Sequence, residues 1–262
     1  MIDIHTHILP GIDDGAKNLD ESFDLARAAS DEGITDVIAT PHHYDGRFSN
    51  IAQDVRDRVQ SLNEKLQKEQ IQLTVHPGQE IHVHKELLLG IERGTLTTLA
   101  STSYLLLEMP PANIPSYLEE LIYELKLQGK QVIIAHPERN AEVAKQPERL
   151  AELIEAGAYA QMTTHSLLGG FGRGVERTAW SLCRQGLIHY VSSDAHHLDR
   201  RGFRMREAYL RIESELGREW SDYYQANARG LLRDIRPGEQ PELLAAPAPN
   251  GWSKLKSWLG RA

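Results

Sequence analysis

Two histidines separated by one residue, His5 and His7, end an apolar run at the start of the sequence. In an extended strand, residues i and i+2 point to the same side, so both imidazoles face one point. The strand pattern stops shortly afterwards, at Pro10 and Gly11. A strand end that presents two imidazole nitrogens in this way is suited to binding a metal ion.

Other residues of metal-ligating type recur along the chain, most of them at or just after the end of a predicted strand. His42 and Glu80 are 38 residues apart, while steps of 28 residues lead from Glu80 to Glu108 and from there to His136. One βα unit is about 30 residues long, so these side chains recur with the period of an α/β fold. The complete set of candidate metal ligands is His5, His7, Asp14, His42, Glu80, Glu108, His136, Asp194 and His196.

The elements that must position these residues are short β-branched runs that alternate with helix-period segments. The predicted strands are Ile2–His5, Asp36–Thr40, Gln72–His76, Tyr104–Glu108, Gln131–His136, Ala158–Thr163 and Ile188–Ser193. The predicted helices are Leu19–Glu32, Ile51–Glu69, Pro115–Leu127, Pro147–Ala156, Val175–Gln185 and Arg204–Leu216, with a shorter helical piece near His84–Glu92. Such alternation is typical of parallel βαβ units.

We therefore expect an α/β protein built as a distorted, TIM-like (β/α)7 barrel with seven strands, irregular around its third unit. The interval from His136 to Asp194 is 58 residues, about twice the repeat, so the strand Ala158–Thr163 should contribute no ligand. In βα-barrels the active site lies at the C-terminal ends of the strands, which is where the candidate ligands fall.

Composition excludes several classes of protein. The chain has 262 residues and a formal net charge of -8, which gives a nucleic-acid partner no electrostatic support. The single cysteine, Cys183, rules out an intrachain disulfide and suits a reducing compartment. The first strand begins at Ile2, which leaves no room for a signal peptide, and no apolar run is long enough to span a membrane. We expect a cytoplasmic protein.

The barrel is expected to occupy residues 1–236, followed by a Pro/Ala-rich linker over 237–250 and a short basic tail over 251–262. In the tail, Trp252, Leu255, Trp258 and Leu259 share one face of a predicted helix flanked by lysines. Such an amphipathic helix can lie in a membrane interface or dock on a partner, and the alternatives are that the tail folds back on the barrel or stays disordered. The glycine-rich segment Leu168–Arg173 lacks the context of a phosphate-binding loop and is predicted to be a flexible loop of the barrel.

Nine ligands are too many for one ion, since a divalent ion takes about four to six donors. Two or three ions fit, with Glu80 as the best candidate for a bridging ligand. Mixed histidine and carboxylate sites accept Mn, Fe, Zn or Co.

The same residues carry a family resemblance. The sequence resembles the polymerase-and-histidinol-phosphatase (PHP) superfamily, and within it the bacterial manganese-dependent protein-tyrosine phosphatases of capsule and exopolysaccharide loci. The matching segments run in order over about residues 1–235: Ile2–His7, Asp13–Gly15, Ala39–His42, Gly78–Ile81, Leu107–Glu108, Ala135–Arg139 and Ser193–Asp199. Each segment is common by itself, but the ordered combination is highly specific.

The resemblance implies a site that holds three divalent ions, and manganese is the metal of the resembling enzymes. His5, His7, Glu80 and Asp194 would hold one ion, and Glu80, Glu108 and His136 a second. Asp14, His42 and His196 would hold the third. A carboxylate at position 108, where many superfamily members have histidine, favours the tyrosine-phosphatase branch over the histidinol-phosphatase branch.

A phosphate ester suits such a site, because three divalent cations outweigh four carboxylates and a phosphate monoester carries about -1.5 to -2 charges. The resemblance implies that Arg139 and Arg201 bind the oxygens of the phosphate group. The expected reaction is hydrolysis of phosphotyrosine by a metal-activated hydroxide. No arginine completes a Cys-x5-Arg loop after Cys183, which excludes a cysteine-based phosphatase.

The resemblance also implies a partner, the tyrosine-rich tail of a membrane tyrosine autokinase that regulates polysaccharide synthesis. On that hypothesis the basic tail would place the enzyme at the inner face of the membrane. Two alternatives remain at this point. One is a small-molecule phosphatase, for example for histidinol phosphate, or a phosphodiesterase. The other is a non-catalytic module that binds a phosphorylated tail.

Overall fold

The structure, a computed structural model, describes residues 1–242. Nine short strands lie in it. They are β1 (Ile2–Thr6), β2 (Asp36–Ala39), β3 (His42–His43), β4 (Thr74–Pro77), β5 (Glu80–His82), β6 (Tyr104–Glu108), β7 (Gln131–Ala135), β8 (Ala158–Thr163) and β9 (Tyr190–Ser192). Seven of them overlap the seven predicted strands, whereas β3 and β5 lie outside the predicted ranges, shortly after the ends of Asp36–Thr40 and Gln72–His76.

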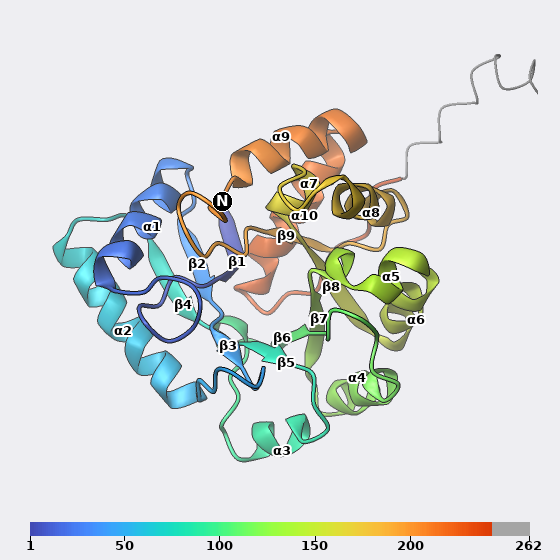
Figure 1. The fold of residues 1–262 in the computed structure, drawn as a ribbon, viewed down its shortest axis with the longest axis horizontal. Helices are drawn as coiled ribbons and strands as arrows, with labels where there is room; N and C mark the ends of the chain where they lie inside the picture. The colour runs from blue at the N-terminus through green and yellow to red at the C-terminus, as the bar shows by residue number, and fades with distance from the viewer. Residues whose placement is uncertain (243–262) are drawn as a thin grey trace, which may run out of the picture.

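The helices surround the strands as a ring (Figure 1). The longer ones are α1 (Leu19–Asp31), α2 (Ala52–Lys68), α4 (Leu118–Leu127), α6 (Glu148–Ala156), α8 (Arg173–Arg184), α9 (Met205–Leu216) and α10 (Arg218–Leu231). The shorter ones are α3 (Leu87–Glu92), α5 (Ala141–Lys145), α7 (Thr164–Leu167) and the 3-10 turns η1 (Leu99–Ser101) and η2 (Pro137–Arg139). The sequence pattern predicted the long helices except α10, and it did not predict α5 or α7.

The strands pair in parallel, but they form two sheets rather than one. One sheet has the order β1-β2-β4 and the other the order β3-β5-β6-β7-β8-β9. Within residues 1–242 the ladders do not close into the single seven-stranded barrel predicted from the sequence. Pro41 interrupts the second strand, since proline offers no N–H to a ladder. Gly78 interrupts the third strand region, between β4 and β5. The position admits no side chain, because a Cβ on residue 78 would lie 2.7 Å from Cγ2 of Ile38.

The two sheets nevertheless meet where β2 and β4 lead into β3 and β5, and at the C-terminal ends of β1 and β9. The chain passes from one sheet to the other directly, between β2 and β3 and between β4 and β5. After β9, the N–H of Asp194 donates to the carbonyl of His5 at 2.9 Å, and the N–H of His7 donates to the carbonyl of Ala195 at 2.8 Å. These bonds draw the ends of β1 and β9 together.

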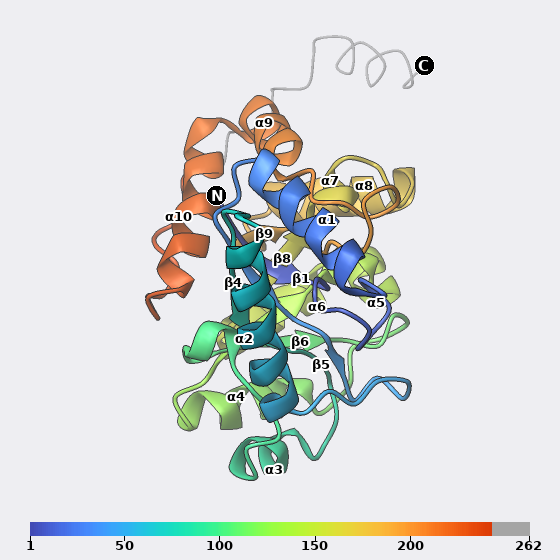
Figure 2. The same ribbon diagram turned by 90° about the vertical axis from the view of Figure 1, so that its left-hand side faces the viewer.

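Apolar side chains fill both faces of the strands, as expected for parallel sheets covered by helices. One cluster lies between strands and helices, and a second, smaller one lies on the inner face with Ile4, Leu106 and Ile133. Ala228 and Leu231 of α10 belong to the inner cluster. In Figure 2, α10 lies on the opposite side of the strands from α5, which follows the end of β7. Helix α10 therefore covers the end of the core that faces away from the predicted site.

Within the part of the chain that the structure describes, every helix is too short or too polar to cross a bilayer. The predicted linker beyond residue 242 and the predicted amphipathic tail lie outside the described residues.

Candidate metal centre

The nine predicted ligands lie together where the strands end. His5 lies in β1 and His7 just beyond it, and their Nε2 atoms are 3.2 Å apart. This is the geometry that the alternation of a strand predicts for residues i and i+2. Two other members occupy strained backbone positions, because His136 has φ +32° and Asp194 has φ +56°. Non-glycine residues in this region are uncommon and cluster at functional sites.

Glu80 lies at the middle of the cluster, with 1% of its surface exposed. Its Oε2 lies 3.2 Å from Nε2 of His5, 3.3 Å from Nε2 of His7 and 3.1 Å from Nδ1 of His42. Its Oε1 is 2.6 Å from Nε2 of His136. One carboxylate thus contacts four imidazoles, which is the arrangement expected of a bridging ligand.

Asp194 is the second buried carboxylate, and its two oxygens have different surroundings. Oδ1 lies 3.3 Å from Nε2 of both His5 and His7. Oδ2 accepts hydrogen bonds from Nη2 of Arg139, at 2.9 Å, and from Nη2 of Arg201. The carboxylate therefore joins the histidine cluster to both arginines singled out in the sequence.

The other two carboxylates of the cluster, Asp14 and Glu108, are more exposed than Glu80 and Asp194 and lie at its border. Oδ1 of Asp14 lies 3.4 Å from Nε2 of His42 and 3.3 Å from Nε2 of His196. Oε2 of Glu108 lies 3.8 Å from Nδ1 of His42 and 3.5 Å from Nδ1 of His82. His82, which the sequence did not place among the ligands, is thus close to the edge of the site.

Potential ligand atoms converge in three groups, each with all members within 4.8 Å of one another. The groups are His5, His7, Glu80 and Asp194; His7, Asp14, His42 and His196; and His42, Glu80 and Glu108. The first group equals the first set implied by the family resemblance, and the second adds His7 to another set. In the third, His42 takes the place of His136, whose Nε2 is hydrogen-bonded to Oε1 of Glu80.

Residues behind the histidines fix their orientation. Nδ1 of His7 pairs with Oδ2 of Asp13 at 2.7 Å, and Nδ1 of His5 pairs with Oε1 of Gln161 at 3.1 Å. Such contacts set the tautomer of an imidazole ligand and leave Nε2 free for a metal. Gln161 lies in β8, the strand expected to contribute no ligand, so this strand supports the site indirectly. Asp13 lies next to Asp14 in the matching segment Asp13–Gly15, and this adjacency is the feature of the sequence that could have identified Asp13 as part of the site.

The chemistry of the donor set fits divalent metal ions. Several buried atoms of the cluster lie close to one another without forming a hydrogen bond among the described residues, namely Glu80 Oε2, Asp194 Oδ1, His42 Nδ1 and His196 Nε2. Buried polar atoms are normally satisfied, because leaving one unpaired costs about 1–3 kcal/mol. Converging unpaired imidazole and carboxylate atoms are what a site for Mn, Fe, Zn or Co requires.

The pKa values of Glu80, His42 and His196 are shifted by burial and by the charged groups that converge in this cluster. Burial opposes ionisation of Glu80, but His5, His42 and His136 outweigh it and hold the pKa of Glu80 well below its usual value. The pKa of His42 is raised to about 9, because the attraction of Glu80 and Asp14 exceeds the cost of burial. The pKa of His196 is lowered to about 4, chiefly by burial and by the nearby charge of His7. His196 therefore presents a neutral imidazole, the form that binds metals.

Cys183, by contrast, takes no part in the site. Its side chain is fully buried in the core between strands and helices, and burial raises its thiol pKa to about 12. A thiol in that state is not a nucleophile near neutral pH.

Parallel α/β sheets with a histidine and carboxylate cluster at the C-terminal strand ends define a metal-dependent enzyme. The family model described as capsular polysaccharide synthesis, CpsB/CapC, matches residues 1–233. The chain belongs to this CpsB/CapC family.

Relatives with assigned activities support the same conclusion. Tyrosine-protein phosphatase YwqE of Bacillus subtilis is 43% identical over 241 residues, which cover 92% of this chain and 95% of the relative. Tyrosine-protein phosphatase CpsB of Streptococcus agalactiae serotype III is 26% identical over 240 residues, with 89% and 99% covered.

A solved structure matches the fold as well. It comes from the crystal structures of YwqE from Bacillus subtilis and CpsB from Streptococcus pneumoniae, described as unique metal-dependent tyrosine phosphatases. The TM-score is 0.89 at 42% identity, and the match covers 94% of this chain and 100% of the other. The family and the enzyme class predicted from the sequence are thereby confirmed.

Proposed function

We propose that the cluster around Glu80 is the active site of a metal-dependent protein-tyrosine phosphatase. The observation that carries the proposal is the position of Glu80, which contacts His5, His7, His42 and His136 with one buried carboxylate. The phosphatase names of the relatives supply the substrate class, a phosphotyrosine protein.

The number and kind of ions belong to the proposal. Three ions are held, most simply manganese, although the donor types also accept Fe, Zn or Co. His5, His7, Glu80 and Asp194, which converge in one group, would hold the first ion. Glu80, Glu108 and His136 would hold the second, with His136 in contact with Glu80. The third takes Asp14, His42 and His196, a set supported by their convergence in one group.

When bound, the ions supply Lewis acidity and a water whose pKa is lowered toward neutrality. The protein's own part is to bind and orient the phosphate. Arg139 and Arg201 each donate a hydrogen bond from Nη2 to Asp194. Their other N–H groups are therefore left to bind phosphate oxygens. Nε of Arg201 is buried and has no partner among the described residues. The phenolate that leaves has an ordinary pKa of about 10, so it needs less protonation than an alkoxide.

A substrate panel tests this function against its alternatives. Purified protein is assayed with a phosphotyrosine peptide, histidinol phosphate and a phosphodiester, each with and without a chelator. We expect the phosphotyrosine peptide to be hydrolysed fastest and the chelator to abolish turnover. Preference for histidinol phosphate would identify a small-molecule phosphatase instead. Binding of the peptide without any hydrolysis in the presence of Mn²⁺ would identify a non-catalytic module.

The physiological partner and location are further parts of the proposal. The substrate is the tyrosine-rich tail of a membrane tyrosine autokinase that controls capsule or exopolysaccharide synthesis, and the enzyme works in the cytoplasm beside the membrane. Residues 251–262 would make the membrane contact through their tryptophans and lysines. Flotation with liposomes compares the full chain with a form that ends at Asn250. Equal flotation of the two forms would remove the membrane contact from the proposal.

We also infer that residues 1–236 form one catalytic unit and that its two sheets are the parts of a distorted seven-stranded barrel. The hydrogen bonds between the ends of β1 and β9, and the direct passages from β2 to β3 and β4 to β5, support it. Limited proteolysis is expected to cut first within residues 237–250, the proposed linker.

A further inference from the structure

Two cavities of different character adjoin the metal centre. The smaller has a volume of about 240 Å³ and lies where β6 and β7 end. Three members of the centre form part of its wall, namely Glu108, His136 and Arg139. Its remaining lining is mostly apolar and consists of Met109, Pro111, Ala135 and Asn140.

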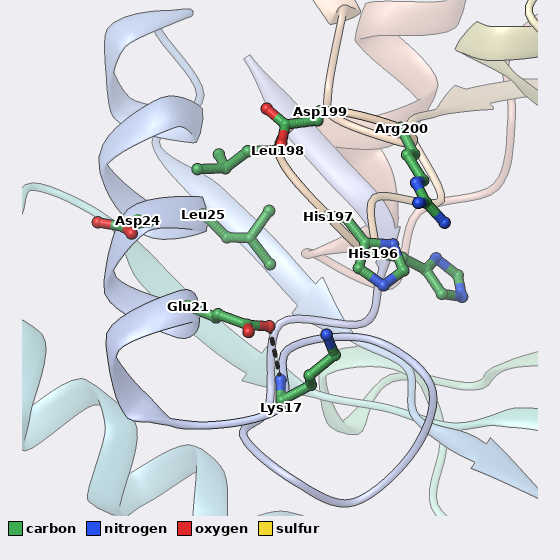
Figure 3. A pocket seen from close by; sticks show the side chains of 9 residues that line it. All are labelled: Lys17, Glu21, Asp24, Leu25, His196, His197, Leu198, Asp199 and Arg200. Carbon is green, nitrogen blue, oxygen red and sulfur yellow. Dashed lines mark hydrogen bonds between the residues drawn. The ribbon is translucent and has the colours of Figure 1, made fainter.

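The larger cavity, of about 380 Å³, lies on the other side of the centre, between α1 and the loop after His196 (Figure 3). His196 is the one proposed ligand in its wall. Charged groups dominate the rest of its lining, which comprises Lys17, Glu21, Asp24, Asp199 and Arg200 along with Leu25, His197 and Leu198. An apolar ring would have to remove water from these charges, so this cavity is a poor site for one.

We propose that the smaller cavity, which we call the aryl pocket, binds the aromatic ring of the substrate's phosphotyrosine. This inference rests on the proposed function. A cavity of about 150 Å³ is large enough to hold benzene, so 240 Å³ accommodates a phenyl ring with its ester oxygen. Met109 supplies a polarizable thioether, which packs favourably against aromatic rings.

The position of the aryl pocket suits the chemistry. His136 and Arg139 line the same cavity as Met109 and Pro111, so a ring bound against Met109 and Pro111 would have its ester oxygen within reach of these two polar groups. The phosphate group then lies between the guanidinium of Arg139 and the carboxylates of the centre, where bound cations would meet it. An alkyl phosphate can place its phosphate group at the same position, but it has no ring to contact Met109 and Pro111 in the apolar part of the lining.

The aryl pocket is also held rigidly before substrate binds. The side chain of Asn140 donates from Nδ2 to the carbonyl of Pro110 at 2.8 Å. Its Oδ1 accepts the N–H groups of Glu142 and Val143, at 2.9 and 3.0 Å, and so caps α5. These bonds tie the loop after β6 to the loop after β7, and a preformed pocket binds without a further ordering cost.

The test compares the binding of two phosphonates to the metal-loaded protein by calorimetry. Phenylphosphonate carries the aromatic ring, and methylphosphonate carries only the anionic head. We expect the unmodified protein to prefer phenylphosphonate. Met109→Ala should weaken phenylphosphonate binding about tenfold and leave methylphosphonate binding unchanged, whereas Met109→Leu keeps most of the preference. Pro111→Trp, at an exposed position on the rim, should obstruct the ring without touching the core.

The matched control is Leu198→Ala, which shortens an apolar side chain in the larger cavity. It should leave the preference for phenylphosphonate as it is. If Leu198→Ala reduces the preference while the Met109 and Pro111 variants keep it, the aryl pocket is wrongly placed. Such a result would leave the phosphatase function intact, because hydrolysis of a phosphotyrosine peptide is measured separately.

Phe171, in the glycine-rich segment Leu168–Arg173, lies beside both phosphate-binding arginines. The guanidinium carbon of Arg139 lies 5.4 Å from the centre of the Phe171 ring, and that of Arg201 lies 5.7 Å from it. Both arginines also donate to Oδ2 of Asp194. One ring and one carboxylate oxygen thus hold two cations side by side.

We infer that Phe171 is a positioning residue for phosphate binding. Two guanidinium groups close together repel each other, and the negative face of an aromatic ring reduces that cost. The ring also restricts where the two planar groups can lie, so their free N–H donors remain directed at the incoming phosphate. Phe171 itself contacts the arginines and need not contact the substrate.

The test uses Phe171→Ala together with a matched control elsewhere on the molecule. In α1, Arg27 lies over Phe23 at 5.8 Å, so Phe23→Ala removes a similar contact far from the phosphate-binding arginines. We expect Phe171→Ala to weaken the binding of inorganic phosphate, measured by calorimetry, about tenfold and to raise KM more than it lowers kcat. Metal content should not change, Phe171→Tyr should restore binding, and Phe23→Ala should have no effect on phosphate.

A double-mutant comparison separates positioning from general destabilisation. In the Arg139→Ala background, Phe171→Ala should cost much less than it does alone, because one of the groups it positions is already gone. Unchanged phosphate binding in Phe171→Ala, or full additivity of the two substitutions, would overturn the inference.

Discussion

Arg139 and Asp194 form the link between the phosphate-binding side of the site and the histidine cluster. Nη2 of Arg139 donates to Oδ2 of Asp194 at 2.9 Å, while Oδ1 of the same carboxylate lies 3.3 Å from His5 and His7. The two residues are 55 positions apart in the chain. Through this carboxylate, the position of the guanidinium depends on the geometry of the proposed metal site.

Arg139→Lys tests the importance of the planar guanidinium. Lysine keeps the charge but loses the fork that can bind Asp194 and a phosphate together. A charge-assisted hydrogen bond contributes about 1.5–3 kcal/mol, so we expect kcat/KM for a phosphotyrosine peptide to fall about 10- to 100-fold. Steady-state kinetics at saturating Mn²⁺ measure this. An unchanged kcat/KM would show that Arg139 has no role in phosphate binding.

Asp13→Asn tests the contact behind His7. The variant keeps the size of the side chain but replaces the anion that holds Nδ1 of His7 at 2.7 Å. Loss of such an orienting contact typically lowers metal affinity about 10- to 100-fold. Titration of the protein with Mn²⁺, followed by activity and by calorimetry, gives the affinity. Asp24→Asn, on the exposed side of α1, serves as the control and should bind Mn²⁺ normally.

Glu80→Gln and Cys183→Ser together separate a metal mechanism from a thiol mechanism. Glu80→Gln removes the central charge of the cluster, and we expect kcat to fall by a factor of about 10² to 10³ or more. Cys183→Ser should keep its activity, because the thiol is buried away from the site. The proposed mechanism is wrong if p-nitrophenyl phosphate hydrolysis survives in the first variant and disappears in the second.

Removal of metal should lower the stability of the protein as well as its activity. Four carboxylates and five imidazoles converge in the site, and the buried unpaired atoms among them lose their proposed partners when the ions leave. A ligand present at 100 times its Kd stabilises the folded state by about 2.7 kcal/mol. We expect the thermal midpoint to fall on chelation and to recover with Mn²⁺. The same midpoint with and without chelator would indicate that the residues hold no ion.

His189 should make stability depend on pH at a site remote from the centre. Burial lowers its pKa to about 4 from an ordinary 6.5, so the unfolded chain binds the proton more readily than the folded one. The free energy of unfolding therefore falls as pH decreases from about 6.5 to 4, by roughly 3 kcal/mol from this residue. Urea unfolding across that range should show a smaller fall for His189→Asn. Parallel curves for the two proteins would contradict the shift.

The sequence by itself determined which residues could do chemistry and roughly where they lie. The His-x-His pair points both rings to one side because strands alternate, and the βα repeat places successive ligands at one end of the fold. Most of the long helices followed from the helical periodicity of the sequence. These features depend on residues near one another in the chain, so local physics specifies them.

Tertiary structure decided what depends on distant segments. The chain divides into two sheets where Pro41 and Gly78 interrupt strands, and the close approach of Gly78 to Ile38 joins segments far apart in sequence. Gln161 behind His5, Phe171 beneath two arginines, and the apolar wall beside His136 each join segments far apart in sequence. Such contacts arise only when the whole core packs, because the free energy of burial depends on which surfaces meet rather than on the order of residues.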